Sequence, residues 1–398
     1  MSGMSETKAY IIAACRTALG RVGGLHARRR LEDLAAPVIT SLLNDTGVSG
    51  EFLDEVIVGN ASAGGNPARL IALASRLPEA VVATTVDQQD ASGLAAILHG
   101  VRLVGNGDAE CVIAGGAESL STAPWRVSRP RNIQQTPYFI SPQQSHCDLA
   151  NAPVGIETTE RLARRFNISR ARQDVYAWNS YERALEARRG KRFQDEIVPL
   201  RANSKEARDQ STVEHDLDDF SEEEPFLEKA GTLTPANISS WHDGAAFVLI
   251  ASEALWKTLG TPPALTLVAN AGLGVGVDDE AAAPIAAVNK LYQRLNGFDR
   301  SHIGIVETSE TSAVQAIAMA EALDISDAAI NPEGGAISRG YPFGAAGAVL
   351  VVRLFSQLVR HATAETSRYG IAAQGASGGL GTAALFGSIT HCHPRLQS

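Results

Sequence analysis

The chain has 398 residues, of which 44% are hydrophobic and 20% are charged. A chain of this composition can bury a sizeable core and, at roughly 150 residues per domain, has room for two or three domains, which excludes a disordered or fibrous protein. Its 35 basic and 44 acidic side chains give a net charge of −9. This acidic balance disfavours a nucleic-acid partner, because such binding depends on neutralising phosphates.

Cysteine usage and the N-terminal sequence predict a cytoplasmic protein. The four cysteines form no CxxC pair and are too sparse to staple the chain. The N-terminus lacks a signal-peptide pattern, and no later stretch approaches the roughly 20 apolar residues that span a bilayer, so we expect no membrane partner. His391-Cys392-His393 offers metal-binding side chains, but without a second ligand cluster the sequence predicts no metal site.

Short apolar runs alternate with helical patterns in the first third of the chain. Residues 8–14 are typical of a strand buried on both faces, and residues 31–43 repeat apolar side chains at helical spacing. The alternation continues with a strand at 55–59, a helix at 93–104 and a strand at 110–116. This order is typical of an α/β protein.

The sequence changes character between residues 123 and 243. Strand-like runs become rare, and Arg, Gln and Ser become more frequent, which predicts a mostly helical, loop-rich insertion. Its strongest helical pattern covers residues 171–188. The acidic segment 214–224 is more typical of a solvated loop than of a binding tail.

The α/β pattern returns after the insertion. Strands are predicted at 245–251, 264–269 and 301–305, and a helix at 313–323. Residues 272–276 carry alternate glycines but open no helix directly, so we expect a mobile loop and not a dinucleotide site.

A weak internal repeat links the two α/β regions. Residues 90–93 and residues 344–347 each open a helix that leads to a glycine-ended strand, which indicates two similar halves around the insertion. The predicted domains are an N-terminal half of residues 1–122 plus 244–268, a loop domain of residues 123–243, and a C-terminal half of residues 269–398.

Collinear motifs over nearly the whole chain resemble those of the thiolase family. They include Arg16-Thr17, Gly65-Asn66-Pro67-Ala68-Arg69, Gly115-Gly116-Ala117-Glu118-Ser119, Gly231-Thr232-Leu233-Thr234, Asp243-Gly244-Ala245-Ala246 and Asn331-Pro332-Glu333-Gly334-Gly335-Ala336-Ile337. The resemblance implies a duplicated five-layered α-β-α-β-α fold with a loop domain over a site for coenzyme A thioesters. It also implies a homodimer or homotetramer that takes the thioester as substrate and needs no separate cofactor.

The same resemblance shows four departures where thiolases carry out their chemistry. Asp90 stands where the family has its nucleophilic cysteine, and Tyr341 where it has the activating histidine. Gly375 stands where the family has a second, acid–base cysteine. In place of an Asn-Glu-Ala-Phe segment the chain has Ser309 followed by Glu310, so only the glutamate is retained.

Asp90 is predicted to act as a general base. As a nucleophile it would have to form a mixed anhydride from a thioester, which is uphill, whereas a base only has to reach a proton α to the thioester or on an acceptor. Its place at a predicted helix start favours the ionised form. The alternative is an N-cap aspartate with a purely structural role.

The other site residues have weaker signals. Tyr341 can hydrogen-bond a thioester oxygen but is a poor base at neutral pH, and its alternative role is to fill space. Glu310 can hold Tyr341 or a water, or serve in structural pairing, and Ser309 has no histidine nearby in sequence. The predicted binding positions are Ser239, in the segment that resembles the family's pantetheine contact, and Gly375, Ser377 and Gly379 in the glycine-rich loop.

Two functions follow from these residues. The first is an acyltransferase that acts on acyl-CoA or acyl-carrier-protein thioesters without a cysteine acyl-enzyme. In it Asp90 is the base, Tyr341 donates to the oxyanion, and backbone amides near Asp90 and Ser377 complete the oxyanion hole. The second is a catalytically silent homologue that serves as a partner or scaffold subunit.

Overall fold

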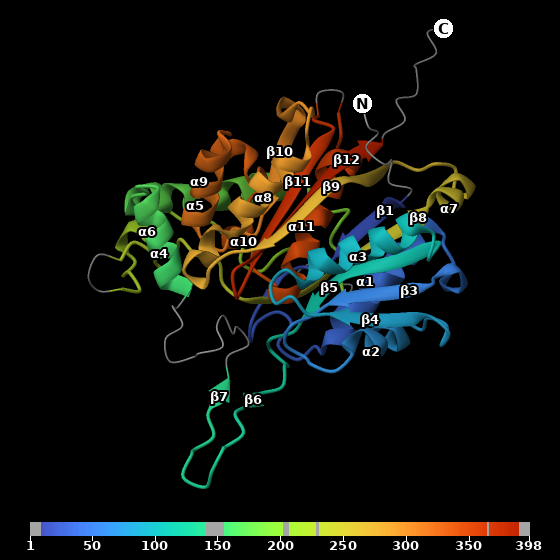
Figure 1. The fold of residues 1–398 in the computed structure, drawn as a ribbon, viewed down its shortest axis with the longest axis horizontal. Coiled ribbons are helices and arrows are strands. Elements are labelled where there is room, and N and C mark those ends of the chain that lie inside the picture. The colour runs from blue at the N-terminus through green and yellow to red at the C-terminus, as the bar shows by residue number, and fades with distance from the viewer. Residues whose placement is uncertain (1–8, 141–154, 202–206, 228–230, 364–365, 390–398) are drawn as a thin grey trace.

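The computed structural model describes residues 9–140, 155–201, 207–227, 231–363 and 366–389. Its strands form a ten-stranded sheet in the order β10-β11-β12-β9-β1-β8-β5-β3-β4, with β2 paired to β8, and a separate β6–β7 hairpin (Figure 1). The strands are β1 (Ala9–Arg16), β2 (Gly20–Arg21), β3 (Glu55–Gly59), β4 (Val82–Val86), β5 (Cys111–Glu118), β6 (Arg126–Val127), β7 (Phe139–Ile140), β8 (His242–Ser252), β9 (Ala264–Gly274), β10 (Ile303–Thr308), β11 (Tyr369–Ala376) and β12 (Leu380–Ile389).

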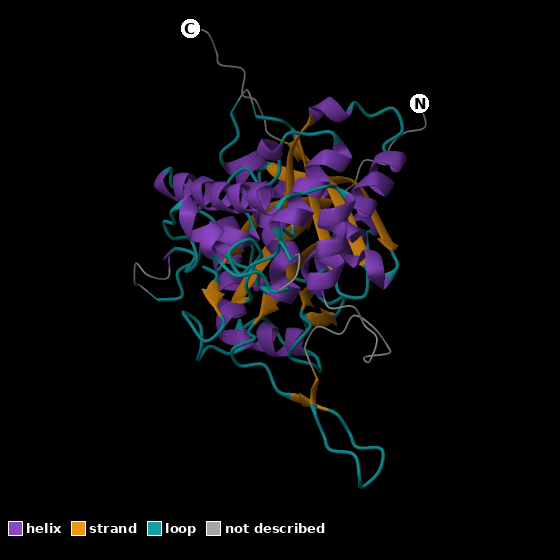
Figure 2. Cartoon of the chain, turned by 90° about the vertical axis from the view of Figure 1, so that its left-hand side faces the viewer, coloured by secondary structure: helices purple, strands orange, loops and turns teal. Residues whose placement is uncertain are grey.

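Helices lie on both sides of this sheet, as Figure 2 shows. They are α1 (Leu31–Thr46), α2 (Pro67–Ala74), α3 (Ser92–Asn106), α4 (Gly155–Arg165), α5 (Arg170–Arg189), α6 (Leu217–Glu222), α7 (Glu253–Thr258), α8 (Ala283–Arg294), α9 (Ala313–Leu323), α10 (Ala336–Arg339) and α11 (Ala346–Phe355). A short 3₁₀ helix, η3 (Val277–Ala282), precedes α8.

Three apolar cores divide the molecule into five layers. One face of β1, β3, β5 and β8 packs against α1 and α2, and the other face packs against α3 and α11. The strands β9, β11 and β12 cover the opposite side of α3 and α11, and their far face packs against α8 and α9. Because β1, β3, β5 and β8 bury both faces, their sequences are nearly continuous apolar runs. The predicted five-layered α/β fold is confirmed.

The two central helices cross in close contact. A Cβ added to Gly93 of α3 would lie 2.9 Å from the backbone nitrogen of Ala348, and one added to Gly347 of α11 would lie 2.8 Å from Leu94. Any larger residue at these two positions would push the helices apart. The segments that form the internal repeat in sequence therefore meet at the centre of the fold, directly behind the turns that open both helices.

Most predicted elements are present with small shifts at their ends. The strand at 55–59 and the helix at 313–323 have the predicted bounds, and α5 matches the predicted helix at 171–188 to within one residue at each end. The helices α4 and α5 of the insertion pack on the outer layer of the C-terminal half. The precise domain boundaries stay a prediction.

Two local predictions were wrong. Residues 272–274 do not form a loop: they continue β9, because each of them pairs with β12, from Gly272 opposite Thr382 to Gly274 opposite Leu380. The acidic segment is not wholly a loop either, because it contains α6. Asp216 caps this helix together with Asp219, and the buried ring of Phe220 anchors it to the body.

The β6–β7 hairpin projects away from the body (Figures 1 and 2). Arg126 pairs with Ile140 and Val127 with Phe139. In the part of the chain that the structure describes, one helical stretch, 343–360, is long and apolar enough to cross a membrane. Because 89% of it is buried inside the protein, its apolar character is that of a core helix.

Candidate active site

Asp90 lies in the turn between β4 and α3, with only 4% of its surface exposed. The preceding residue, Gln89, has a left-handed backbone with φ +52°, which costs energy for a side chain of this kind and holds the turn tight. α3 has Ala91 at its N-cap position and no side-chain cap. The N-cap alternative for Asp90 is therefore wrong, since Ala91 holds the N-cap position and the helix has no side-chain cap.

Instead, the Asp90 carboxylate faces the C-terminal half. The hydroxyl of Tyr341 donates to Asp90 Oδ1 at 3.0 Å, and the backbone N–H of Ser377 donates to Asp90 Oδ2 at 3.0 Å. Behind Tyr341, the Gln374 side-chain amide donates to the phenol oxygen at 2.8 Å. These residues form a chain of hydrogen bonds from Gln374 through Tyr341 to Asp90.

The turn between β11 and β12 supplies the remaining predicted positions. Gly375 lines the same cavity as Asp90, and a Cβ placed on it would lie 3.0 Å from Pro284 Cδ. Gly379 has φ +77°, which lets the turn close against Val275. The amide of Ser377, expected to face a thioester oxygen, donates to Asp90 in this structure.

Burial is the main influence on the pKa values of Asp90 and Tyr341. It raises the pKa of Asp90, and the hydrogen bonds from Ser377 and Tyr341 offset only part of the rise. Burial and the nearby Asp90 also raise the pKa of Tyr341 well above its ordinary value, so the phenol stays protonated. The helix start was expected to favour the ionised form of Asp90, but desolvation acts in the opposite direction and raises the pKa of the carboxyl group.

A cavity of about 380 Å³ opens beside Asp90 and Tyr341. Its lining is mostly small, apolar or hydroxyl-bearing, and among the lining residues that the structure describes there is no lysine, arginine or histidine. The other residues that line it include Ile156, Thr158, Leu233, Ile238, Glu280, Thr311, Ser312, Gln315, Gly375 and Ser377. The cavity can hold an acyl chain next to a buried carboxyl group.

Glu310 and Ser309 lie near the site but are engaged elsewhere. The Glu310 carboxylate accepts hydrogen bonds from the side chains of Tyr176, Ser180 and Asn331 and from the Ile337 amide. This geometry fits structural pairing, and no described hydrogen bond joins Glu310 to Tyr341. The Ser309 hydroxyl donates to Gln315 Oε1 at 2.8 Å and does not line the Asp90 cavity.

Ser239 lies at the edge of the site. It is half-buried, and its amide donates to the carbonyl oxygen of Thr311 at 3.0 Å. Its neighbour Ile238 and its partner Thr311 both line the cavity, although Ser239 itself does not. Ser239 therefore lies directly behind the cavity wall that Ile238 and Thr311 form.

Two residues of the site were missed in the sequence. Gln374 is a lone amide inside the apolar run of β11, and this polar interruption of a buried strand was the signal that could have identified it. Glu280 lines the cavity, and its carboxylate accepts from the Gly378 amide at 2.8 Å. Nothing in the sequence separates Glu280 from its neighbours Asp278 and Asp279.

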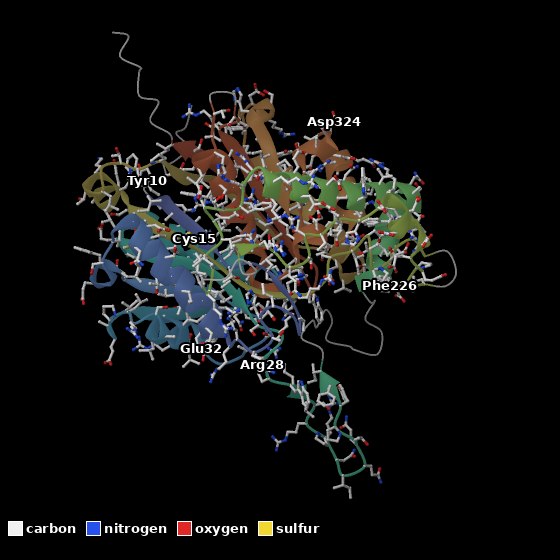
Figure 3. The ribbon with its side chains drawn as sticks, turned by 180° about the vertical axis from the view of Figure 1, so that it is seen from behind. Tyr10, Cys15, Arg28, Glu32, Phe226 and Asp324 are labelled. Carbon is white, nitrogen blue, oxygen red and sulfur yellow. The ribbon has the colours of Figure 1, made fainter. Side chains whose placement is uncertain are left out.

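The described cysteines lie in the core, away from this cavity. Cys15 on β1 (Figure 3) and Cys111 on β5 are buried, and burial raises the pKa of the first thiol to about 11 and of the second to about 12. Both are therefore protonated and poor nucleophiles. Cys147 and the segment His391-Cys392-His393 lie outside the described residues. Among the described residues, no group of three or more metal-ligating side chains is placed to hold a metal ion.

Comparisons with known proteins match nearly the whole chain. The family described as "Thiolase, N-terminal domain" matches residues 9–254, and "Thiolase, C-terminal domain" matches residues 262–388. A putative acetyl-CoA C-acetyltransferase, VraB, of Staphylococcus aureus (strain COL) is 33% identical over 386 residues, which cover 95% of this chain and 99% of that protein. An acetyl-CoA acetyltransferase of Shinella zoogloeoides is 32% identical over 398 residues, covering 96% of this chain and 100% of that protein.

A solved structure shows the same fold. The crystal structure of the Bacillus anthracis acetyl-CoA acetyltransferase superposes with a TM-score of 0.89 at 27% sequence identity. The superposition covers 97% of this chain and 100% of that chain.

Proposed function

The chain belongs to the thiolase family, and from this premise we propose that it is an acetyl-CoA acetyltransferase-like enzyme that works without a cysteine acyl-enzyme. Asp90 removes a proton from the carbon next to a thioester carbonyl, and the resulting enolate attacks a second acyl thioester. The observation that carries the proposal is the hydrogen bond from Tyr341 to Asp90 at the wall of the cavity. It places a base and a donor side by side.

The electrostatics of this pair support the proposed step. Before reaction, Tyr341 and the Ser377 amide both donate to Asp90. As Asp90 takes up the proton, negative charge moves to the thioester oxygen, and hydrogen bonds to a neutral carboxyl group are weaker than those to a carboxylate. Both donors are then free to follow the charge to the oxygen. The raised pKa of Asp90 also makes it a stronger base than an exposed aspartate.

The substrate class follows from the family and its named relatives. Two of the relatives are named for acetyl-CoA, so we propose acetyl-CoA, or an acyl-carrier thioester with the same pantetheine arm, as the substrate. Ser239 would contact that arm. No separate cofactor is needed, because the thioester itself supplies the activated carbonyl.

We propose a homodimer or homotetramer, as the family resemblance implies, and a cytoplasmic location, as the sparse cysteines indicate. Mass measurement over a range of protein concentrations tests the assembly. A dimer or tetramer is expected, and a monomer at all concentrations would remove this part of the proposal.

Proton abstraction can be measured directly. In D₂O the wild-type protein should exchange the α-protons of acetyl-CoA for deuterium, detected by mass spectrometry. Asp90→Asn should slow this exchange by about 10²–10⁴-fold, the usual contribution of a general base. Tyr341→Phe should slow it by about 10–10²-fold, because one oxyanion donor is lost.

A silent partner subunit is the second candidate, and one observation favours it. Both Asp90 oxygens are already paired with Tyr341 and Ser377, so the site is satisfied without any ligand. If the wild-type protein exchanges no α-protons, alone or with the proteins encoded beside it, the silent function replaces the first proposal.

A further inference from the structure

Two carboxylates from different elements meet at one turn of the cavity wall. Asp90, from the turn before α3, accepts the Ser377 amide at 3.0 Å, and Glu280, from η3, accepts the next amide along, that of Gly378, at 2.8 Å. Both side chains line the 380 Å³ cavity. Two consecutive backbone amides therefore hold the two carboxylates as neighbours.

The packing of Gly375 explains how Glu280 comes to this place. Pro284, which follows η3 in α8, would lie 3.0 Å from a Cβ at position 375. The η3–α8 segment thus occupies the space next to Gly375, and Glu280 lies four residues before Pro284 in that segment. Gly375, which stands at the position of the family's second cysteine, and Glu280 line the same cavity.

The charges that surround Glu280 come from few groups. Asp90 and Tyr341 line the same cavity as Glu280, and no cation lines its described wall. On its own element, Asp278 pairs with Arg161 of α4 at 3.1 Å and Asp279 with Arg165 at 3.8 Å, and both pairs are exposed to solvent. Burial raises the pKa of Glu280, and Asp90 adds to the rise. Two adjacent carboxylates without a counter-ion favour the state in which one of them holds a proton.

We propose that Glu280 shares a proton with Asp90 and is the second acid–base group of this site, the one that protonates the departing thiolate. This inference rests on the proposed function.

The cycle balances in atoms and charge. Asp90 takes the α-proton of the first thioester, and the enolate carbon forms a bond to the carbonyl carbon of the second. As the tetrahedral adduct collapses, its C–S bond breaks, and the proton of Glu280 goes to the sulfur, which leaves as a free thiol. Asp90 then holds one proton more and Glu280 one fewer, and transfer between the neighbours restores the starting state. Two thioesters give one β-ketoacyl thioester and one thiol.

The experiment separates the two proton transfers. With acetyl-CoA as the probe, Glu280→Gln should keep α-deuterium exchange within about threefold of wild type, because Asp90 is intact. Release of free thiol should fall by about 10²-fold or more, because the general acid is lost. Asp278→Asn, a neutralised carboxylate on the same element that does not line this cavity, is the matched control and should change neither rate.

A second measurement does not depend on turnover. Carboxyl ¹³C NMR of the unliganded protein, with the Asp90 signal identified by its loss in Asp90→Asn, follows the titration of that group. Two coupled carboxyl groups titrate in two steps, so Glu280→Gln should shift the Asp90 titration to a single step, whereas Asp278→Asn should leave both steps in place.

The outcomes separate this inference from the function on which it rests. An Asp90 titration that Glu280→Gln leaves unchanged overturns the shared proton, whether or not the protein is active. Equal loss of exchange and thiol release in Glu280→Gln overturns the separate acid role. Absence of exchange in the wild type, with the Asp90 titration still shifted by Glu280→Gln, overturns the proposed function but supports the shared proton.

Discussion

Asp90 and Glu196 are both buried carboxylates, but they lie in opposite electrostatic surroundings. The Glu196 carboxylate accepts from Arg16 Nε at 2.8 Å, from Ser356 at 2.6 Å and from Arg353. Burial alone would raise its pKa, but Arg353 and Arg16 outweigh burial and lower it to about 2. Asp90 receives only neutral donors, and its pKa is raised.

The difference shows that burial by itself does not assign a role to a carboxylate. Glu196 stays ionised at every physiological pH, and its two arginines fix β1 and α11 to the loop domain, so it serves the fold. Asp90 borders a cavity whose described lining contains no cation, so no fixed positive charge opposes the proton transfer proposed for it. A carboxyl group with a perturbed pKa is a stronger candidate for chemistry when it borders an open cavity than when it is ion-paired in the core.

The largest expected effect comes from converting the Asp90 region into a thiol site. Asp90→Cys, Tyr341→His and Gly375→Cys together restore the side chains that the family uses. Catalytic groups that act as a unit are strongly non-additive, so each single change should stay near baseline. The triple variant should form a stoichiometric acyl adduct with acetyl-CoA, whereas the wild type should form none, as read by intact-mass spectrometry.

The Gly375→Cys change brings a Cβ to within 3.0 Å of Pro284 Cδ and requires a small local shift. The double variant Asp90→Cys and Tyr341→His avoids this shift and contains the thiol and base that acylation requires. If both variants fold yet neither is acylated, Asp90 does not occupy the nucleophile position. An adduct on the wild type would show that a thiol or another nucleophile still reacts.

Neutralising Glu196 tests whether this carboxylate serves the stability of the fold. Glu196→Gln removes the carboxylate that Arg16 and Arg353 share, while Asp209 still pairs with Arg16 and Glu333 with Arg353. The loss of these charged hydrogen bonds should lower the free energy of unfolding by about 1.5–3 kcal/mol. Asp90→Asn, which removes no ion pair, should change it by about 1 kcal/mol or less. Chemical denaturation measures both, and Asp195→Asn, at an exposed neighbour of Glu196, is the control. Similar losses in the two variants would contradict the contrast.

The pH dependence of stability should differ in sign between the two groups. Glu196 has a folded pKa lowered from 4.5 to about 2, so its stabilisation is full above about pH 4.5 and is lost as the pH falls toward 2. Asp90 has a raised folded pKa, so its protonated form favours folding, and this contribution is lost as the pH rises through the folded pKa. Denaturation of wild type, Glu196→Gln and Asp90→Asn between pH 2 and pH 8 should show the two trends as slopes of opposite sign, with that of Glu196 below about pH 4.5.

The smallest effect concerns the hydrogen bond between the two site residues. Tyr341→Phe removes one donor to Asp90 and should lower the free energy of unfolding by about 1 kcal/mol. It should also raise the pKa of Asp90 further, since a bond to the charged form is lost, and shift the midpoint of the exchange–pH profile upward. Tyr138→Phe on the projecting hairpin should change neither quantity. An unchanged midpoint in Tyr341→Phe would mean that the phenol does not act on Asp90.

Much of the architecture was predictable because its signals are local. Apolar runs such as residues 55–59 become buried strands, and the apolar helix at 313–323 becomes a core helix, since each pattern by itself favours one secondary structure. The path of β9 through its glycines was not predictable, because it depends on pairing with β12, whose sequence begins more than a hundred residues later. The acidic helix α6 depends on the pocket that receives Phe220.

By itself, the sequence determined the order of strands and helices, the duplicated α/β plan and the residue types at positions 90, 341 and 375. Only the tertiary structure decided what those residues contact, because their partners are distant along the chain: Tyr341 lies 251 residues and Ser377 lies 287 residues from Asp90. Gln374 and Glu280 join the site through the same long-range packing. Their desolvation and mutual charge, which set the protonation of the site, arise only when the two halves are brought together.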